Sequence, residues 1–370
     1  MPLAAQSLPY IRAIAAYQPG KPITELAREL GLPVADIVKL ASNENPLGMS
    51  PKAKEAAAAA LAGGERYPDS FELVAAVARK HAVASSQIVL GNGSNDVLDL
   101  IARVFLDTGR SAVAAQYAFA VYPIATLSVG GEMIVVPARH FGHDLRAMGA
   151  AIRPDTRVVW IANPNNPTGT FLPAEDLRAF LERTPREVIV VLDEAYGDYL
   201  SEEEQYDSVP WIAEFPNLIV VRTFSKIYGL AGLRVGYGLA AESVAGLLNR
   251  VRQPFNCNNL ALAAAKAALE DTDFVEKSSK TNRKGLRDVG AGLARLGLET
   301  IPSRGNFLTF MAGKSKEEAA NVNRALLKQG LIVRPLVGYD MPEWLRATIG
   351  TADENARFLA ALEKALAQSV

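Results

Sequence analysis

The sequence predicts an α/β protein, with a mostly parallel central sheet in a large domain followed by a smaller α+β domain. Through the first 250 residues, short apolar runs rich in β-branched residues alternate with segments of helical periodicity. The runs are apolar at consecutive positions, which is typical of strands buried on both faces of a parallel sheet. Beyond about residue 250 helical segments dominate and strands become sparse. The length of 370 residues also suits two domains better than one compact core.

Two helices are expected before the first strand of the large domain. Ser50 should cap a helix that starts with Pro51 and covers 51–62, where an alanine-rich run ends at two glycines. Ser70 should cap the next helix, which extends to about His81. The strands of the large domain are expected at 87–90, 112–115, 133–136, 157–162, 187–192 and 218–223.

The C-terminal part has a different pattern. Helices are expected around 259–270, 272–297, 315–329 and 353–367, and strands at 306–311 and 331–334. We therefore expect three parts along the chain. They are an N-terminal segment that packs with the small domain (1–45), a large domain (46–250) and a small C-terminal domain (251–370).

Composition narrows the class of protein. Hydrophobic residues make up 49% and charged residues 21% of the chain, which is typical of a globular protein and not of a disordered one. The 39 Lys and Arg residues nearly balance the 40 Asp and Glu residues, so neither nucleic acid nor a membrane is expected as a partner. The N-terminus lacks the basic start and apolar core of a signal peptide. We therefore expect a cytoplasmic protein.

Sulfur and imidazole groups are scarce. Cys257 is the only cysteine, which excludes an intrachain disulfide and fits a reducing compartment. We expect a buried, inert thiol there and not a nucleophile. His140 and His143 are the only close pair of histidines, and no acidic or cysteine cluster accompanies them at ligand spacing, so no metal site is expected.

Two apolar runs are followed by residues that can take part in a chemical reaction. Lys226 follows the run 217–224, and Asp193 follows the run 187–192. A lysine amine that is partly buried beside other cations can be neutral and form a Schiff base with an aldehyde. Asp193 can keep a pyridine nitrogen protonated, and Arg234 offers a forked donor set for a phosphate. Separately these residues indicate a surface lysine and a helix cap, but together they favour a pyridoxal-phosphate enzyme.

The segment 88–96 predicts a strand, a glycine-rich turn and the start of a helix. Backbone N–H groups at such a turn, with the helix dipole behind them, can bind an anion. Gly93 permits close approach of the backbone, and Ser94 adds a hydroxyl. Many turns of this kind bind nothing, and the third glycine of the dinucleotide fingerprint is missing here.

The segment 163–169 contains two Asn-Pro steps after the strand 157–162 and predicts a rigid turn. Ligands of open α/β sheets bind outside the carboxyl ends of the strands, so Asn166 could donate to a phenolic oxygen there. Tyr196, three residues beyond Asp193, could reach the same oxygen. A merely structural role of the turn is the alternative.

Six segments carry a resemblance to a known family: Lys39–Gly48, Arg66–Asp69, Asn163–Gly169, Asp193–Tyr196, Arg222–Arg234 and Leu331–Leu336. In this order and spacing, from about residue 10 to 360, they resemble the histidinol-phosphate aminotransferase family. The resemblance implies a fold-type-I enzyme that depends on pyridoxal 5'-phosphate. It also implies a homodimer with its sites at the subunit interface, and a small-molecule amino donor and keto acceptor as partners.

The resemblance also implies roles for individual residues. Lys226 would be the catalytic lysine that bonds the cofactor, Asp193 would pair with the ring nitrogen, and Phe119 would stack on the ring. Asn166 and Tyr196 would hold the phenolic oxygen. The residues implied around the cofactor phosphate are Ser94, Asn95, Ser225, Arg234 and, from the partner subunit, Tyr67. Those implied in substrate binding are Tyr17, Asn166, Arg334 and Arg346.

Two departures from the family pattern affect the expected substrate. Asn95 replaces an acidic residue beside the phosphate, and Gln116-Tyr117-Ala118 stands where the family has Pro-Thr before the stacking aromatic ring. The second departure resembles paralogues linked to aromatic amino acids. We expect transamination of L-histidinol phosphate, with 2-oxoglutarate as acceptor. The alternatives are phenylalanine or tyrosine transamination and, in another class, decarboxylation of the threonine-phosphate type.

Overall fold

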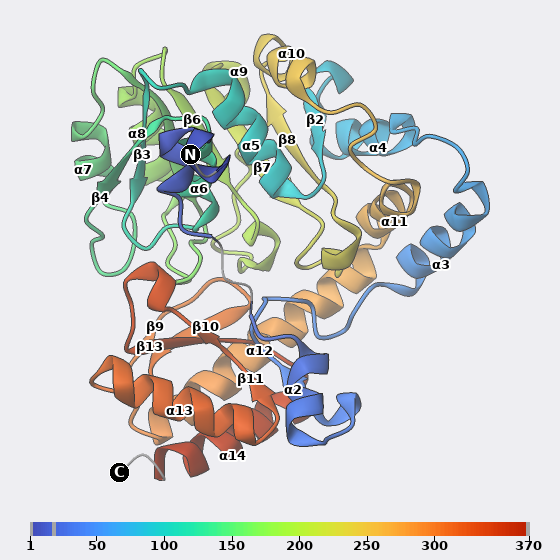
Figure 1. The fold of residues 1–370 in the computed structure, drawn as a ribbon. Helices are drawn as coiled ribbons and strands as arrows, with labels where there is room; N and C mark the ends of the chain where they lie inside the picture. Colours follow the sequence, from blue (N-terminus) through green and yellow to red (C-terminus); the bar gives the residue numbers. More distant parts are fainter. Residues whose placement is uncertain (1–2, 17–19, 368–370) are drawn as a thin grey trace.

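The computed structural model describes residues 3–16 and 20–367, and its largest element is a seven-stranded sheet with the order β2-β8-β7-β6-β5-β3-β4 (Figure 1). Neighbouring strands pair in parallel except β8, which is antiparallel to both β7 and β2. The strands are β2 (Ile88–Gly91), β3 (Ser111–Ala115), β4 (Glu132–Val136), β5 (Thr156–Ala162), β6 (Ile189–Asp193), β7 (Leu218–Thr223) and β8 (Gly236–Ala240). The prediction of a mostly parallel central sheet is confirmed.

Helices cover both faces of this sheet, because alternate strand residues enter two separate cores. Val190 and Leu192 of β6 pack into the first core, and Ile189 and Val191 into the second. The helices of the first core are α3 (Pro51–Ala60), α4 (Phe71–His81), α7 (Leu145–Ala150), α8 (Ala174–Arg183), α9 (Trp211–Glu214) and α11 (Asn259–Glu270). Those of the second are α5 (Ser94–Phe105), α6 (Val121–Ser128) and α10 (Glu242–Val251).

The C-terminal part, drawn in orange and red in Figure 1, contains an antiparallel sheet with the order β12-β13-β10-β9. Its strands are β9 (Thr300–Ile301), β10 (Phe307–Met311), β12 (Arg334–Pro335) and β13 (Trp344–Thr348). Helices α12 (Thr272–Arg295), α13 (Lys316–Lys328) and α14 (Ala352–Ala367) pack with it in a third core.

The N-terminal part joins this C-terminal part through a parallel pair, β1 (Val38–Lys39) with β11 (Leu331–Ile332). Helices α1 (Pro9–Arg12) and α2 (Ile23–Leu30) precede it. Short 3₁₀ turns complete the chain: η1 (Leu3–Gln6), η2 (Val34–Asp36), η3 (Leu61–Gly63), η4 (Ser85–Gln87), η5 (Gly197–Tyr199), η6 (Ala231–Leu233) and η7 (Val337–Tyr339). The pairing of β1 with β11 supports the expected packing of the N-terminal segment, and the three domain limits remain predictions.

Both predicted N-cap residues occupy their positions, but only one of them makes the side-chain bond of a cap. The Ser50 hydroxyl accepts a hydrogen bond from the Ala53 N–H at 3.0 Å and caps α3 as expected. Ser70 makes no such bond at α4. Ser70 still occupies the N-cap position, and the neighbouring Asp69 carboxylate accepts from the Phe71 N–H at 2.9 Å.

Strand β8 was not predicted, because its sequence Gly-Tyr-Gly-Leu-Ala contains two glycines, which lower strand propensity. Both glycines are required by packing. A Cβ at Gly238 would lie 2.9 Å from a methyl group of Val97, and one at Gly236 would meet the backbone of Ser94. The predicted strand 331–334 is also corrected, since it divides into β11 and β12, which belong to different sheets.

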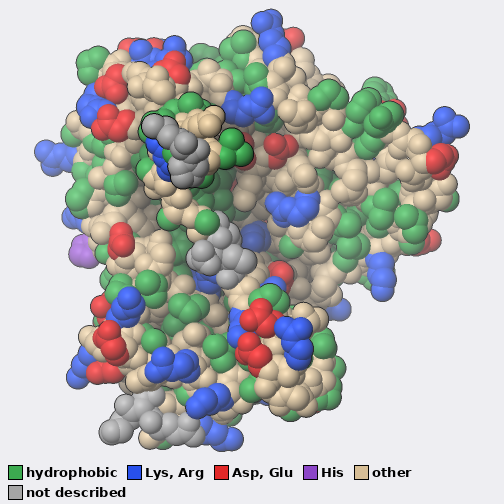
Figure 2. All heavy atoms as spheres, in the orientation of Figure 1, with side chains coloured by type: hydrophobic (Ala, Val, Ile, Leu, Met, Phe, Trp, Pro, Cys, Tyr) green, Lys and Arg blue, Asp and Glu red, His purple; other side chains and the backbone are tan. Residues whose placement is uncertain are grey.

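The surface agrees with the balanced composition. On the face drawn in Figure 2, basic and acidic side chains are interspersed. Within residues 3–16 and 20–367, no helix has both the length and the apolar character needed to cross a bilayer.

Candidate active site

A cavity of about 320 Å³ lies where the carboxyl ends of β5, β6 and β7 face the C-terminal part of the chain. The last residue of each of these strands lines the cavity: Ala162, Asp193 and Thr223. This agrees with the rule that ligands of open α/β sheets bind outside the carboxyl ends of the strands. The lining also contains most of the predicted site residues: Ser94, Asn95, Phe119, Asn166, Tyr196, Ser225, Lys226, Arg234, Arg334 and Arg346.

Lys226 lies in the loop that follows β7. Its amine donates a hydrogen bond to the Ser42 carbonyl oxygen at 3.3 Å and lies 5.7 Å from the centre of the Tyr196 ring. The loop closes through a bond from the Gly229 N–H to the Lys226 carbonyl at 2.9 Å. Gly229 has φ +72°, and a Cβ there would collide with the Gly48 carbonyl, so only glycine suits this close turn.

Asp193 ends β6 with a buried carboxylate. One oxygen accepts a hydrogen bond from the Tyr122 hydroxyl at 2.9 Å, and the other accepts from the Ala195 N–H at 3.2 Å. Burial raises the pKa of Asp193 to about 6, although the bond from Tyr122 acts in the opposite direction. A cationic partner in the cavity would stabilise the ionised form.

Tyr122 is a site residue to which the sequence assigned no role. Its ring stacks on Trp160 with centroids 5.4 Å apart and planes 3° apart, and meets Phe119 edge-on at 5.7 Å. The stacked pair fixes the hydroxyl that reaches Asp193. Its position three residues after Phe119 was the available signal, but its partner is 71 residues away in the chain.

Donor groups gather at the start of α5. The first N–H groups of a helix have no intrahelical partner, and Ser94 and Asn95 place this end at the cavity wall. The Arg234 guanidinium donates to the Ser225 hydroxyl at 3.4 Å. Gly93 has φ +80°, and a Cβ there would collide with that guanidinium. Hydroxyl, N–H and guanidinium donors in one wall form a binding place for an anion of phosphate size.

Asn43 is a second residue that the sequence analysis missed. Its side-chain amide donates to the Tyr196 hydroxyl at 2.8 Å, and its backbone N–H donates to the Thr348 hydroxyl at 2.9 Å. Asn43 therefore connects three distant parts of the chain beside the cavity. It lies in the segment 39–48, which carries the family resemblance, but nothing local indicated its partners.

Strand β13 places Arg346 in the wall of the same cavity. Its guanidinium donates to the Asn166 side-chain oxygen and, at 2.9 Å, to the Ala41 carbonyl. It also lies over the Phe307 ring, 5.2 Å from the ring centre. The turn 163–169, with cis peptide bonds at Asn163-Pro164 and Asn166-Pro167, thus contributes Asn166 to the cavity wall.

Two predicted residues are not among those lining the cavity. Tyr67 is 79% exposed and stacks on Phe255 with ring centroids 4.5 Å apart. Tyr17 lies outside the described residues. The expectation that Tyr67 serves a partner subunit stays a prediction.

Cys257 and the histidine pair His140 and His143 are not among the residues that line the cavity. Burial raises the pKa of the Cys257 thiol to about 11, and the thiol donates to the Gly91 carbonyl at 3.3 Å. His143 lies in a loop, as expected, but its ring is buried and contacts the Ala162 carbonyl at 2.9 Å. In the part of the chain that the structure describes, no three His, Cys, Asp or Glu residues form a group able to hold a metal ion.

Comparisons with known proteins agree with this fold and site. The family model for aminotransferase class I and II matches residues 35–362. The chain is 68% identical to histidinol-phosphate aminotransferase 1 of Dechloromonas aromatica, over 99% of this chain and 100% of that one. It is 55% identical to histidinol-phosphate aminotransferase 2 of Pseudomonas aeruginosa, over 98% of both chains.

Solved structures of aminotransferases have the same fold. Histidinol-phosphate aminotransferase of Sinorhizobium meliloti, crystallised in complex with pyridoxal 5'-phosphate, is 27% identical, with a TM-score of 0.89 over 99% of both chains. Aspartate aminotransferase of Thermus thermophilus with maleate, 23% identical, shares the fold with a TM-score of 0.82 over 98% of both chains. Fold and site together define an aminotransferase of fold type I. The chain belongs to aminotransferase class I and II and, within it, to the histidinol-phosphate aminotransferase family.

Proposed function

We propose that this protein is a pyridoxal-phosphate-dependent aminotransferase that exchanges an amino group between L-histidinol phosphate and 2-oxoglutarate, giving imidazole acetol phosphate and L-glutamate. The high identity to relatives named for this activity, over nearly the whole chain, supports the proposal. The observation that carries it is the set of groups around one cavity: Lys226, the buried Asp193 and three arginines.

The residues present fit the cofactor. Pyridoxal 5'-phosphate supplies an aldehyde, a phosphate and a pyridine ring that withdraws electrons from a neighbouring carbon. The donor wall of Ser94, Ser225 and Arg234 suits the phosphate. The raised pKa of the buried Asp193 carboxyl is the state expected of a group whose cationic partner is a ligand.

Asp193 and its neighbours would keep the ring nitrogen protonated. The carboxylate presents an oxygen held by the Tyr122 hydroxyl, so its orientation is fixed before the cofactor binds. A charge-assisted hydrogen bond of this kind contributes roughly 1.5–3 kcal/mol. Asn166 and Tyr196 would hold the phenolic oxygen, and Phe119 would lie against the ring.

Lys226 would move the proton of the reaction. Its amine would take the proton from the substrate's α carbon and return it on the other side of the exchange. In the present structure the amine is held by the Ser42 carbonyl and lies over the Tyr196 ring. These contacts hold the Lys226 amine near the strand ends. A fixed position suits an amine that would transfer a proton at one atom, the substrate's α carbon.

Two arginines would bind the substrate anions. Arg346 would take the α-carboxylate of glutamate as a two-pronged pair, and Arg334 would take the more distant anion, the phosphate of histidinol phosphate or the second carboxylate of glutamate. Tyr17, which the family resemblance places near that anion, is part of the same proposal.

Two other activities are the alternatives. Aromatic transamination is suggested by Gln116-Tyr117-Ala118 alone, whereas the relatives at 55–68% identity in the comparisons are named for histidinol phosphate. Decarboxylation of the threonine-phosphate type has no supporting observation in the site. Steady-state specificity constants for histidinol phosphate and phenylalanine, each with 2-oxoglutarate, decide between the first two, and a larger value for phenylalanine would overturn the substrate proposal.

We further propose a cytoplasmic homodimer in which Tyr67 reaches the cofactor phosphate of the partner subunit. Large apolar side chains are exposed near Tyr67: Leu61, Phe71 and Phe255. Apolar side chains also gather over α3 and α4 at the right of Figure 2. Exposed apolar side chains that gather in one region are typical of a protein interface. The molar mass in solution, measured by light scattering, tests the dimer.

A further inference from the structure

Glu194, which is buried, and Arg222, which is partly buried, form an ion pair behind the candidate active site. Neighbouring residues of a strand point to opposite faces of its sheet. Asp193 and Thr223 line the cavity, so Glu194 and Arg222, which adjoin them, point to the other face. The Arg222 guanidinium donates to one Glu194 oxygen with its Nε at 3.0 Å, and its Nη2 lies 2.8 Å from the same oxygen.

The pair is part of a polar row that crosses four strand ends. The Ser208 hydroxyl donates to the other Glu194 oxygen at 2.6 Å. Arg222 lies opposite Tyr237 in the pairing of β7 with β8, and the Tyr237 hydroxyl meets His81 at 2.9 Å. On the β5 side, the Asn163 amide donates to the Tyr206 hydroxyl at 3.0 Å, and burial and the Glu194 charge raise the pKa of that phenol.

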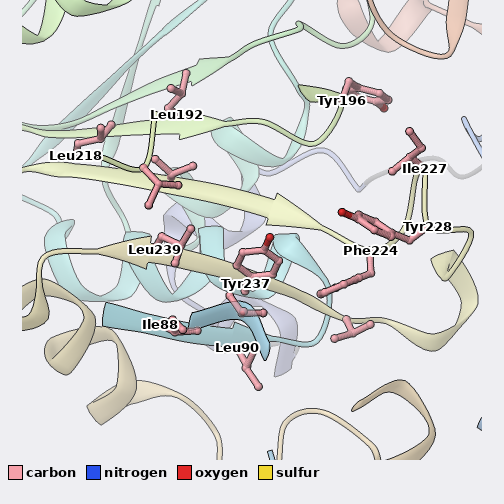
Figure 3. Packing of buried hydrophobic residues seen from close by; sticks show 14 of the residues in the cluster. Ile88, Leu90, Leu192, Tyr196, Leu218, Phe224, Ile227, Tyr228, Tyr237 and Leu239 are labelled. Atoms are coloured by element: carbon pink, nitrogen blue, oxygen red, sulfur yellow. The ribbon is translucent and has the colours of Figure 1, made fainter. Parts of the chain in front are cut away.

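Aromatic rings surround this row. Figure 3 shows Tyr237 beside Leu239 and, further along, Phe224 and Tyr228 close to one another. Phe224 lies 5.1 Å from Tyr228 and 5.6 Å from Tyr237 between ring centroids. Phe224 and Tyr228 flank Lys226 in the chain, so the packing below the row continues directly into the loop that carries the amine.

We propose that the Glu194–Arg222 pair is a positioning device of the active site, which fixes the ends of β6 and β7 against each other and so sets the spacing between Asp193 and Lys226. The proposal rests on the proposed aminotransferase function. The backbone supports it, because the Glu194 N–H donates to the Val221 carbonyl at 2.9 Å, beyond the last residue of β6. The side-chain pair therefore extends the ladder where the two strands would otherwise separate.

Other charged groups also lie around the Glu194–Arg222 pair. Asp207, on the loop after η5, has a carboxylate oxygen 3.8 Å from Nη2 of Arg222. The charge of Asp198, in η5, also stabilises the Arg222 guanidinium and raises its pKa. From α4, Lys80 donates to Tyr228 at 2.8 Å. Burial, followed by the charges of Arg222 and Lys80, lowers the pKa of His81 to about 3, so His81 is neutral in the working range.

Charge-deleting substitutions give a test that packing alone does not reproduce. Glu194→Gln keeps the shape and removes one negative charge behind the site, whereas Arg222→Gln removes one positive charge. With pyridoxal 5'-phosphate bound, the visible absorbance changes with pH as the nitrogen that would join Lys226 to the cofactor loses its proton. The pH midpoint of this change should fall in Glu194→Gln and rise in Arg222→Gln. Each shift should reach about half a pH unit, and kcat should fall about tenfold or more with little change in KM.

Two further variants complete the cycle. The double variant Glu194→Gln/Arg222→Gln should return the midpoint to the wild-type value, with kcat no lower than in the single variants, because the two residues act as one unit. Glu214→Gln is the matched control, since Glu214 accepts a two-pronged bond from Arg178 on an exposed surface. It should change neither midpoint nor kcat.

The outcomes separate this inference from the function on which it rests. Shifts of the same sign in both single variants, or wild-type kcat in both, would overturn the positioning role. If these variants fail to fold, Glu194→Asp and Arg222→Lys keep the charges and alter the reach, and should lower kcat without moving the midpoint; unchanged kcat would again overturn it. A wild-type protein that binds no pyridoxal 5'-phosphate would instead contradict the proposed function.

Discussion

Arg334 of β12 and Arg346 of β13 lie directly opposite each other in an antiparallel pair, and both line the cavity. Opposite residues of such a pair point to the same face of the sheet, so two guanidinium groups enter one confined space. Like charges in this arrangement repel, and an anionic ligand removes the repulsion. The pairing register of β12 and β13 thus places two guanidinium groups where one anionic ligand would relieve their repulsion.

Substituting Arg334→Ala should lower the specificity constants for histidinol phosphate and glutamate strongly and that for phenylalanine much less. Phenylalanine has no second anion for Arg334 to bind. Removing one partner of a buried charge pair costs roughly 3–5 kcal/mol, and even a part of this would change the ratio clearly. Steady-state kinetics with the three amino donors measures it.

The control for this substitution is Arg295→Ala at the exposed end of α12, which should leave all three constants unchanged. Equal losses for all three donors in Arg334→Ala would assign Arg334 a structural role. They would also remove the main residue-level argument for a phosphorylated substrate.

Asp193→Asn should reduce turnover far more than it weakens cofactor binding. A neutral amide would not keep the ring nitrogen protonated, so the ring would withdraw electrons less strongly from the reacting carbon. Turnover should fall by more than tenfold, which corresponds to about 1.4 kcal/mol of barrier. Single-turnover kinetics and cofactor titration measure the two effects separately, and a smaller fall would show that Asp193 is only a cap.

The same carboxyl should govern the stability of the cofactor-free protein between about pH 4 and 6. Burial raises the pKa of Asp193 from 3.8 to about 6, so the folded state favours the protonated form. Its contribution to stability is therefore present at low pH and is lost as the pH rises through 6. The loss is at most about 3 kcal/mol, since one pKa unit corresponds to about 1.4 kcal/mol.

Asp193→Asn has no such proton to lose. Denaturant unfolding of the two cofactor-free proteins at pH 5 and 7.5 should therefore show a larger decrease in the free energy of unfolding for the wild type. Parallel decreases in both proteins would mean that Asp193 does not titrate in this range.

The sequence predicted the parts of the fold and site that depend on local pattern. Lys226 and Asp193 were found because each follows a buried strand, and six strands of the central sheet were found from their apolar runs. Tyr122 and Asn43 were missed, because their bonds to Asp193 and Tyr196 join positions 71 and 153 residues apart. Such contacts depend on the tertiary fold and leave no local pattern.

Gly93→Ala should weaken the binding of pyridoxal 5'-phosphate by displacing Arg234. The new Cβ would occupy the space of the guanidinium, and φ +80° adds strain. Gly297→Ala is a matched control, because Gly297 has φ +72° with no heavy atom within 4 Å of an added Cβ. Gly297→Ala should lose about 1 kcal/mol of stability, and Gly93→Ala should lose more, because its φ of +80° and ψ of 164° lie in a region that is essentially restricted to glycine. Only Gly93→Ala should raise the dissociation constant of the cofactor. Equal cofactor affinities would contradict the anion-binding role of this turn.

Complementation between two defective variants should test whether Tyr67 serves the partner subunit. Lys226→Ala removes the proposed catalytic amine, and Tyr67→Phe removes the hydroxyl of a residue that is exposed on the single chain. In a mixed dimer, the Lys226 site of the Tyr67→Phe subunit would receive an intact Tyr67 from the other subunit. After subunit exchange at equal amounts, about a quarter of all sites would be intact in a two-fold symmetric dimer. Activity at limiting cofactor should therefore exceed the sum of the two separate preparations. An activity no higher than that sum, in a sample shown by mass spectrometry to contain mixed dimers, would place Tyr67 outside the partner's site.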